Sequence, residues 1–347
     1  MDGLLVVDKP VGPTSHDVVA RVRRILGEQR VGHTGTLDPG ASGVLPLVVG
    51  RATRLARFLS AAGKSYDAAI QLGVATDTGD SAGTPVGRAF QGPFPGRESI
   101  DRTLDAFRGT FLQQPPVYSA KKIGGKRSYR LARAASRVAQ RSFAAPGDRR
   151  LRQPDADADA NAGALAAPEH VESPAAARDE SGPAVPAPVS VTVYALALGG
   201  VDGGLVTLRV DCSAGFYVRG LAHDLGERLG VGGHLAALKR VRSGDLTLAD
   251  ATALGALELD PPRAQAALVP LAQMLPALTA LTLTHEGARR ARHGLDLGPA
   301  DFEGGLAACA SAGGARPFRL LDTAGDLIGV AESIEGSGLL HPAVVLV

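Results

Sequence analysis

The sequence has few cysteines and no long hydrophobic run, and these absences exclude several classes of protein. Its 347 residues include two cysteines, Cys212 and Cys309. Two distant cysteines form neither a disulfide framework nor a zinc cluster, so we expect a protein of the reducing cytoplasm. No run of about 18 apolar residues appears, so we expect no membrane span. The first residues lack a basic segment followed by a long apolar one, and we expect no signal peptide.

Motifs that bind common cofactors are also missing. There is no P-loop, no dinucleotide-binding fingerprint and no cluster of metal ligands. Hydrophobic residues make up 45% and charged residues 21%, which is ordinary for a globular protein, and the length suits two domains.

The net charge of +2 conceals an uneven distribution. Residues 1–150 carry 23 Lys and Arg against 12 Asp and Glu, whereas residues 151–190 carry 2 against 7. A basic half on a nearly neutral chain indicates a polyanionic partner on one side. A solvated surface in an arginine-rich chain would show the same pattern.

The strongest basic feature lies within residues 109–147, which contain no acidic residue. At 3.6 residues per turn, five arginines would share about a third of a helix circumference: Arg127, Arg130, Arg133, Arg137 and Arg141. Such a stripe could follow a phosphate backbone, although a solvated amphipathic helix would look the same. Residues 142–188, rich in Ala, Pro, Asp and Glu, are expected to be a disordered insertion.

Hydrophobic periodicity predicts mixed secondary structure. Residues 3–7, 65–72, 191–198 and 205–212 are expected as strands, the second with clean alternation. Helices are expected after Thr14 or Ser15, near residues 52–59 and 98–110, and over residues 218–229. Residues 30–50 contain many Gly and Pro and are expected to be a loop or a series of turns. From about residue 278, short β-like runs with Gly turns predict a small β-rich domain.

Two segments carry candidate catalytic groups. Asp38 lies in a Gly-rich loop before Pro39, where it could act as a nucleophile or general base, or simply form a turn. Arg219 would lie in the first turn of a helix, where the helix dipole disfavours a cation. A nearby carboxylate would explain that position, although a surface arginine remains an open alternative.

Several sequence blocks resemble those of the TruB family of tRNA pseudouridine synthases, in the family's order. They are LVVDKP at residues 5–10 with Gly12 and Ser15, GHTGTLDP at 32–39, KSY at 64–66, QPPVYSAKK at 114–122, CSAGFYVR at 212–219, DLG at 224–226 and LKR at 238–240. The segment EGARRARHG at 286–294, with LIGV at 327–330, more weakly resembles a PUA RNA-binding domain. The insertion at 142–188 departs from the family pattern but touches none of the catalytic blocks.

The resemblance implies an α+β pseudouridine synthase fold with a central mixed, mainly antiparallel sheet flanked by helices. It also implies a catalytic domain over residues 1–275 and a small C-terminal β-rich PUA-like domain over residues 278–347. The activity implied is isomerisation of the T-loop uridine of tRNA, at position 55, with no cofactor and no metal. Extrusion of that base from its stack would cost a few kcal/mol.

Roles for individual residues follow from the same resemblance. Asp38 is the catalytic carboxylate, which attacks C1′ of the ribose or C6 of the base, or removes a sugar proton. Tyr66 stacks on the uracil and takes part in moving the C5 proton, and Arg219 is the ion-pair partner of Asp38. Four further residues form the substrate-binding set. His33 holds the T-loop of the RNA, Lys9 supports the catalytic loop of the protein, and Tyr217 and Leu238 line the pocket for the base. The stripe that contains Arg130, Arg133 and Arg137 contacts RNA phosphates.

The implied partner is tRNA, bound at the T-arm and elbow by a monomer with no obligate protein partner and no membrane. A T-arm chaperone with weak or no isomerase activity is the main alternative. An Asp-nucleophile glycosidase would need a second carboxylate, and none stands out. Membership of the guide-RNA-dependent branch of the superfamily is disfavoured by the absence of a long basic tail.

Overall fold

In the computed structural model, residues 1–116, 122–123, 126–127, 186–305 and 317–346 are described. They form two units, one made of Met1–Ala62 with Ser243–Val347 and the other of Gly63–Arg242. The first unit contains residues of both predicted domains, and the predicted boundary at residues 275–278 stays a prediction. The predicted stripe and the predicted insertion at residues 142–188 fall outside the described residues, except for the ends at residues 127 and 186–188.

Strand β3 (Ala41–Val49) is the centre of the N-terminal sheet of the first unit. It pairs antiparallel with β1 (Gly3–Lys9) on one side and β2 (Val31–His33) on the other, and β1 pairs in parallel with β14 (Thr252–Ala253). The prediction of a loop throughout residues 30–50 was therefore wrong. Residues 44–49 are all buried, so they show no alternation that would mark a strand.

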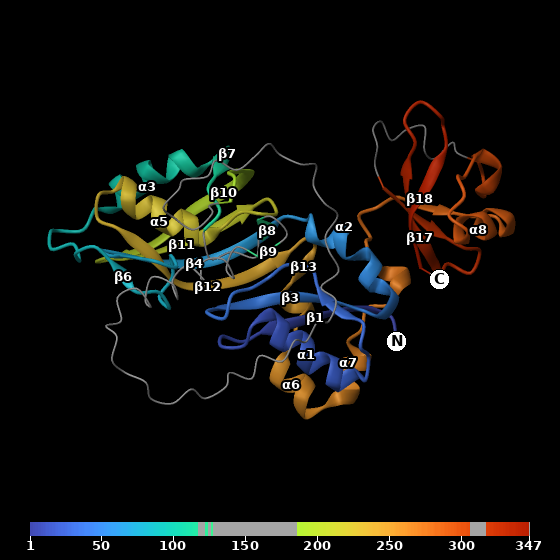
Figure 1. Cartoon of the computed structure of the whole chain (residues 1–347), viewed down its shortest axis with the longest axis horizontal. Helices are drawn as coiled ribbons and strands as arrows, with labels where there is room; N and C mark the ends of the chain where they lie inside the picture. Colours follow the sequence, from blue (N-terminus) through green and yellow to red (C-terminus); the bar gives the residue numbers. More distant parts are fainter. Residues whose placement is uncertain (117–121, 124–125, 128–185, 306–316, 347) are drawn as a thin grey trace, which may run out of the picture. The chain divides into compact units, whose positions relative to one another are not determined.

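Helix α1 (Ser15–Leu26) begins as its sequence predicts. The Thr14 side chain accepts from the Asp17 amide at 3.1 Å, and the Asp17 carboxylate accepts from the Thr14 amide, which makes a capping box. Gly27 ends the helix at φ +64°, a conformation that glycine adopts without strain. Helix α1 packs on β2 and on two later helices, α6 (Leu254–Leu259) and α7 (Pro261–Ala266) (Figure 1).

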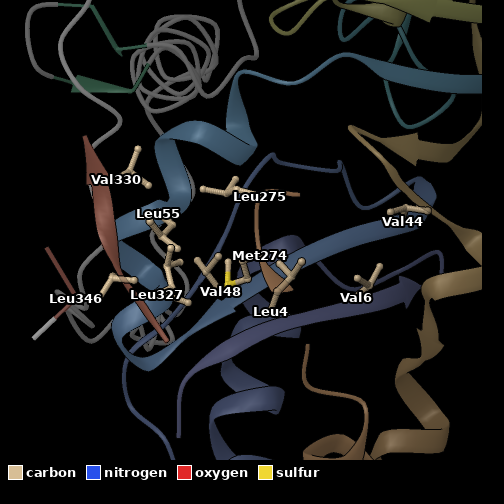
Figure 2. Packing of buried hydrophobic residues seen from close by; sticks show 11 residues of the cluster. Leu4, Val6, Val44, Val48, Leu55, Met274, Leu275, Leu327, Val330 and Leu346 are labelled. Carbon is tan, nitrogen blue, oxygen red and sulfur yellow. The ribbon is translucent and has the colours of Figure 1, made fainter. Parts of the chain in front are cut away.

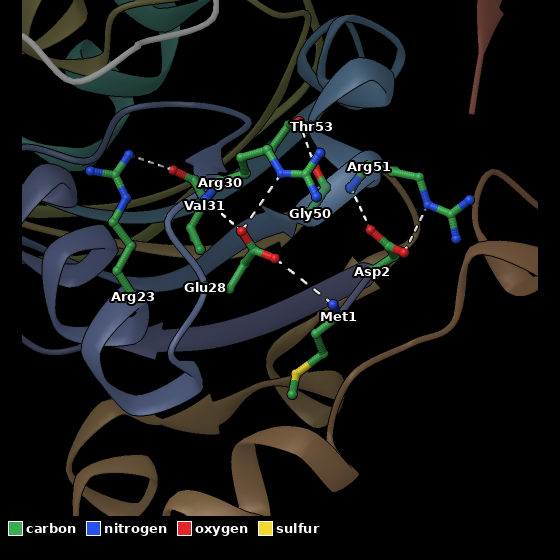
Figure 3. Close-up of polar contacts among 9 residues, drawn as sticks. All are labelled: Met1, Asp2, Arg23, Glu28, Arg30, Val31, Gly50, Arg51 and Thr53. Atoms are coloured by element: carbon green, nitrogen blue, oxygen red, sulfur yellow. Dashed lines mark hydrogen bonds and ion pairs between the residues drawn. The ribbon is translucent and has the colours of Figure 1, made fainter. Parts of the chain in front are cut away.

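Polar contacts brace the ends of these strands (Figure 3). The Arg51 backbone and guanidinium donate to Asp2 at 2.6 and 2.8 Å. Burial raises the pKa of Asp2, but these hydrogen bonds outweigh it and leave the pKa lowered. Glu28 accepts from the Arg30 amide at 2.9 Å, which lowers the pKa of its carboxyl. Both carboxylates are therefore held ionised beside the chain that enters β1 and β2.

A second sheet in the first unit contains the C-terminal strands in the order β15-β16-β17-β18. Their bounds are Ala280–Thr282, Phe318–Leu321, Leu327–Ser333 and Leu340–Val345. Ile328 and Ala331 pack in one cluster with α8 (His285–Arg292). Leu327 and Val330 pack in another with residues of β1 and β3 (Figure 2). The predicted small β-rich region is confirmed.

The remaining elements of the first unit are short. They are η1 (Gly50–Leu55), α2 (Ala56–Ser60), β13 (Leu246–Thr247), η3 (Leu248–Asp250), η4 (Leu271–Gln273) and η5 (Pro299–Asp301). The predicted helix near residues 52–59 thus begins as a 3-10 turn before it becomes α-helical.

The second unit contains strands in the order β12-β4-β11-β10-β7. Their bounds are β12 (Gly233–Ser243), β4 (Lys64–Leu72), β11 (Leu205–Cys212), β10 (Val189–Asp202) and β7 (Gly109–Gln113). Pairs β4–β11, β11–β10 and β10–β7 are antiparallel. Tyr66, Ala68 and Ile70 are buried while Asp67 is exposed, which confirms the predicted alternation.

Helices α3 (Arg97–Leu104) and α5 (Val218–Arg228) pack on each other and on this sheet (Figure 1). The other elements are β5 (Ala75–Thr76), β6 (Pro85–Val86), η2 (Asp105–Phe107), β8 (Lys122–Ile123) and β9 (Lys126–Arg127). Helices flanking mainly antiparallel strands confirm the predicted α+β class. Among the described residues, no helix is long and apolar enough to cross a membrane.

Candidate active site

Asp38 lies half-buried in the loop that joins β2 to β3 in the first unit. The loop is held at both ends, because the Thr34 amide donates to the Pro46 carbonyl at 3.1 Å and the Ala41 amide donates to the Asp38 carbonyl at 3.0 Å. The Gly12 amide donates to the Pro39 carbonyl at 2.8 Å from the turn before α1. The backbone on both sides of the carboxylate is therefore tied to neighbouring structure.

Ser15 holds the residue before Asp38. Its hydroxyl donates to the Leu37 carbonyl at 3.0 Å and accepts from the Leu37 amide at 2.8 Å. Ser15 is 1% exposed and Leu37 3%, so both backbone groups would lack water if the hydroxyl were lost. This contact joins the start of α1 to the loop across 22 residues of sequence.

Lys9 is fully buried at the end of β1, an unusual place for an ammonium group. Its Nζ donates to the Pro10 carbonyl at 2.9 Å and to the Ala41 carbonyl at 2.6 Å, just after the Asp38 loop. The rings of His33 and His16 lie edge to face with centroids 5.3 Å apart. Lys9, predicted from one block, thus lies in the same unit as His33 and Asp38, predicted from another, and it contacts the end of the Asp38 loop.

In the second unit, Tyr66 lies on β4 at 9% exposure and is hydrogen-bonded to the guanidinium of Arg240 on β12. Arg240 is 1% exposed. Burial lowers the pKa of this guanidinium, while the nearby Tyr66 opposes the shift through charge and hydrogen bonding. Leu238 is half-buried two residues earlier on β12, so it lies on the same face of that strand as Arg240.

Lys64 adds a second buried cation to this region. Burial, and then the charge of Arg240, lowers the pKa of its ammonium from 10.5 to about 8. Its exposure is 6%. The Tyr66 phenol therefore lies in a part of the sheet that is both dry and electropositive.

Arg219 lies in the first turn of α5 and is 8% exposed. Its guanidinium donates to the Thr78 carbonyl at 2.9 Å and lies 3.8 Å from the Asp80 carboxylate. Asp80 is the kind of nearby carboxylate that the helix dipole argument required. Whether Arg219 also pairs with Asp38 stays a prediction.

Asp80 was not identified as a site residue from the sequence, because it belongs to a turn that contains Gly and Asp and carries no motif. Its Oδ1 accepts from the Thr78 hydroxyl at 2.7 Å and from the Ala82 amide at 3.1 Å. A β-bridge to Leu235 ties the same turn to β12. The carboxylate beside Arg219 is thus held in place by the folded turn. No sequence motif at residues 76–82 predicted it.

Tyr217 is half-buried at the N-cap position of α5, two residues before Arg219. The second unit therefore brings four predicted residues onto one sheet and the helix that packs on it: Tyr66, Tyr217, Arg219 and Leu238. Arg130, Arg133 and Arg137 lie outside the described residues.

Comparisons with known proteins agree with the blocks noted in the sequence. Residues 23–144 match the family model described as TruB family pseudouridylate synthase, N-terminal domain. Residues 219–275 match the model of the tRNA pseudouridylate synthase B C-terminal domain. The chain is 37% identical to tRNA pseudouridine synthase B of Solibacter usitatus, covering 100% of each chain. It is also 37% identical to the protein of that name from Geobacter sulfurreducens, covering 97% of this chain and 95% of the other.

Solved structures share the fold. A chain of a Cbf5-Nop10-Gar1 complex matches with a TM-score of 0.64 at 24% identity, covering 99% of this chain and 85% of that one. A chain of the archaeal box H/ACA sRNP Nop10-Cbf5 complex matches with the same TM-score at 22% identity, covering 99% and 86%. At these identities the similarity concerns the fold alone.

Proposed function

The chain belongs to the TruB family of pseudouridylate synthases and is an isomerase that converts uridine in tRNA to pseudouridine, and we propose that Asp38 is its catalytic carboxylate. We propose further that the target is the T-loop uridine at position 55, which enters the site everted from the T-arm. The observation that carries the role of Asp38 is the anchoring of its loop, in which the backbone of Leu37, Asp38 and Pro39 is bonded to neighbouring structure.

The reaction itself needs no outside reagent. The bond from C1′ of the ribose to N1 of uracil breaks, and a bond from C1′ to C5 forms. C5 loses its proton and N1 gains one, so atoms and electrons balance within the nucleotide. An ionised Asp38 would attack C1′ or C6, or would remove a sugar proton, and each of these roles requires a carboxylate held in place.

Tyr66 and Arg219 complete the proposed catalytic set. The buried Arg240 supports the role of Tyr66, because a phenol fixed by a guanidinium is oriented to stack on a uracil ring and to assist transfer of the C5 proton. A guanidinium within about 4–6 Å of a carboxylate lowers its pKa and keeps it ionised. We propose that Arg219 does this for Asp38.

The remaining predicted residues would hold the RNA or the pocket. Lys9 would support the Asp38 loop through the Ala41 carbonyl, and His33 would contact the rearranged T-loop. Tyr217 and Leu238 would line the pocket for the everted base. The stripe with Arg130, Arg133 and Arg137, together with a PUA-like domain over residues 278–347, would contact phosphates without reading sequence.

We propose a cytoplasmic monomer without an obligate protein partner, although the solved structures of similar fold come from complexes that contain Nop10. The alternative of a T-arm chaperone with weak or no isomerase activity has no observation in its favour. Incubation of the purified protein with an unmodified tRNA transcript, followed by mapping of pseudouridine, separates the two. Pseudouridine at position 55 is expected, and a transcript left unmodified would contradict the proposed function.

The role of Asp38 is tested with Asp38→Asn, which keeps the shape of the side chain and removes the charge. We expect tritium release from tRNA labelled at C5 of uridine to be abolished, while tRNA affinity stays within about tenfold, or about 1.4 kcal/mol. The control is Asp245→Asn, at an exposed aspartate in the turn after β12, which should leave turnover unchanged. Turnover by Asp38→Asn would remove this carboxylate from the mechanism.

A further inference from the structure

Gln113 ends strand β7 and is 2% exposed, and its side chain is bonded to the backbone of a residue 104 positions away. Its Nε2 donates to the Tyr217 carbonyl at 2.9 Å, and its Oε1 accepts from the Tyr217 amide at 2.8 Å. Both polar groups of one residue are thus paired with one carboxamide. This is the pattern by which a neighbouring strand pairs with a residue in an antiparallel sheet.

The residue that Gln113 holds is the N-cap of α5. Tyr217 is extended, at φ −110° and ψ 107°, and its side chain makes no capping hydrogen bond. Its carbonyl also accepts from the Leu221 amide at 3.2 Å, at the start of the helix. The Gln113 carboxamide therefore fixes the direction in which the chain enters the helix that bears Arg219.

Close packing limits any other position of this carboxamide. A Cβ added at Gly220 would lie 3.0 Å from the Gln113 Nε2, so a larger residue there would displace the carboxamide by a few tenths of an ångström. The Phe111 ring, two residues earlier on β7, meets the Phe216 ring edge to face at 6.4 Å. Strand β7 thus contacts the segment before α5 in two places, through the hydrogen-bonded carboxamide and through the aromatic ring.

We propose that Gln113 is a positioning residue for the isomerisation: it fixes Tyr217 and the first turn of α5, and thereby the guanidinium of Arg219. The inference rests on the proposed catalytic role of Arg219. Gln113 itself touches no reacting atom. A residue that served only stability would change the fraction of folded protein, but not the rate at which folded protein reacts.

The experiment uses two substitutions of Gln113 and one matched control in the full-length protein. Gln113→Met keeps nearly the same volume without the polar groups, and Gln113→Asn keeps an amide too short to reach Tyr217. The control is Gln91→Met, since Gln91 is the same residue type in the same unit, is exposed, lies outside the family blocks and donates to the nearby Ala89 carbonyl. Single-turnover rates at saturating enzyme, tRNA affinity and amide hydrogen exchange over residues 214–222 are measured for each.

Both Gln113 variants should react about 10- to 100-fold more slowly, the range that follows from a small misplacement of a catalytic group. Their tRNA affinity should stay within about threefold of wild type. The Tyr217 amide should exchange faster in both, and the control should match wild type throughout. If Gln113→Met does not fold, the result for Gln113→Asn decides.

A rate within about twofold of wild type in a folded Gln113 variant overturns the inference, and so does a loss of affinity as large as the loss of rate. Unchanged exchange of the Tyr217 amide also overturns it. The proposed function is judged separately by the wild-type protein, because pseudouridine formation there stands whether or not Gln113 matters.

Discussion

Removal of the Ser15 hydroxyl tests whether the Asp38 loop depends on helix α1. In Ser15→Ala, the Leu37 amide and carbonyl lose the partner that they contact at 2.8 and 3.0 Å. Ser15 and Leu37 are 1% and 3% exposed, so water does not replace the hydroxyl without local opening. Each unsatisfied buried group costs about 1–3 kcal/mol, and part of this is offset because no hydroxyl is buried. We expect the free energy of unfolding to fall by about 2–3 kcal/mol.

The same substitution should also affect catalysis, since Leu37 directly precedes Asp38. A loop that moves by about 1 Å would lower the single-turnover rate of folded protein about 100-fold at most. Unfolding in urea followed by circular dichroism gives the stability change, and single-turnover tritium release gives the rate. Both are measured on the same preparations.

Thr14→Ala is the matched control for Ser15→Ala. It removes the capping hydroxyl of the same helix, one residue earlier, at an exposed position where that hydroxyl bonds to Asp17. Loss of such a cap costs about 1 kcal/mol, and the rate of folded protein should be unchanged. The reasoning fails if Ser15→Ala is within about 0.5 kcal/mol of wild type, or if Thr14→Ala slows the reaction equally.

Two further predictions concern charge. With its pKa at about 8 instead of 10.5, Lys64 holds a proton in the unfolded chain but not in the folded one between these pH values. The free energy of unfolding should therefore rise with pH across that window, by at most about 1.4 kcal/mol per pH unit. Lys64→Met should raise stability at pH 7 and flatten the rise above pH 8. Burial raises the pKa of the Cys212 thiol from 9.0 to about 12, so the unfolded thiol loses its proton near pH 9 first, and Cys212 opposes the rise there in both proteins. The free energy of unfolding is measured by urea unfolding at several pH values. The same pH dependence in wild type and Lys64→Met would contradict this prediction. Charge reversal at Arg130, Arg133 and Arg137 should weaken tRNA binding and reduce its dependence on salt, and an unchanged salt slope would show that these arginines do not contact phosphates.

The local elements were largely readable from the sequence because their signals lie within a few residues. The cap at Thr14, the alternation in residues 65–72 and the hydrophobic periodicity of residues 218–229 each predict a structure that depends mostly on neighbours in the chain. The exception was residues 41–49. There a buried strand carries Gly43 and Pro46, and burial on both faces removes the alternation by which a strand is recognised.

The candidate site also has one part that the sequence determined and another that only the tertiary structure decided. The sequence by itself determined which blocks carry Asp38, Tyr66 and Arg219, since a motif records residue types and their order. Tertiary structure alone decided what holds them: Ser15 on Leu37, Arg240 on Tyr66 and Gln113 on Tyr217. Those contacts join residues 22 to 174 positions apart, and a hydrogen bond depends on distances of a few ångströms that spacing along the chain does not encode.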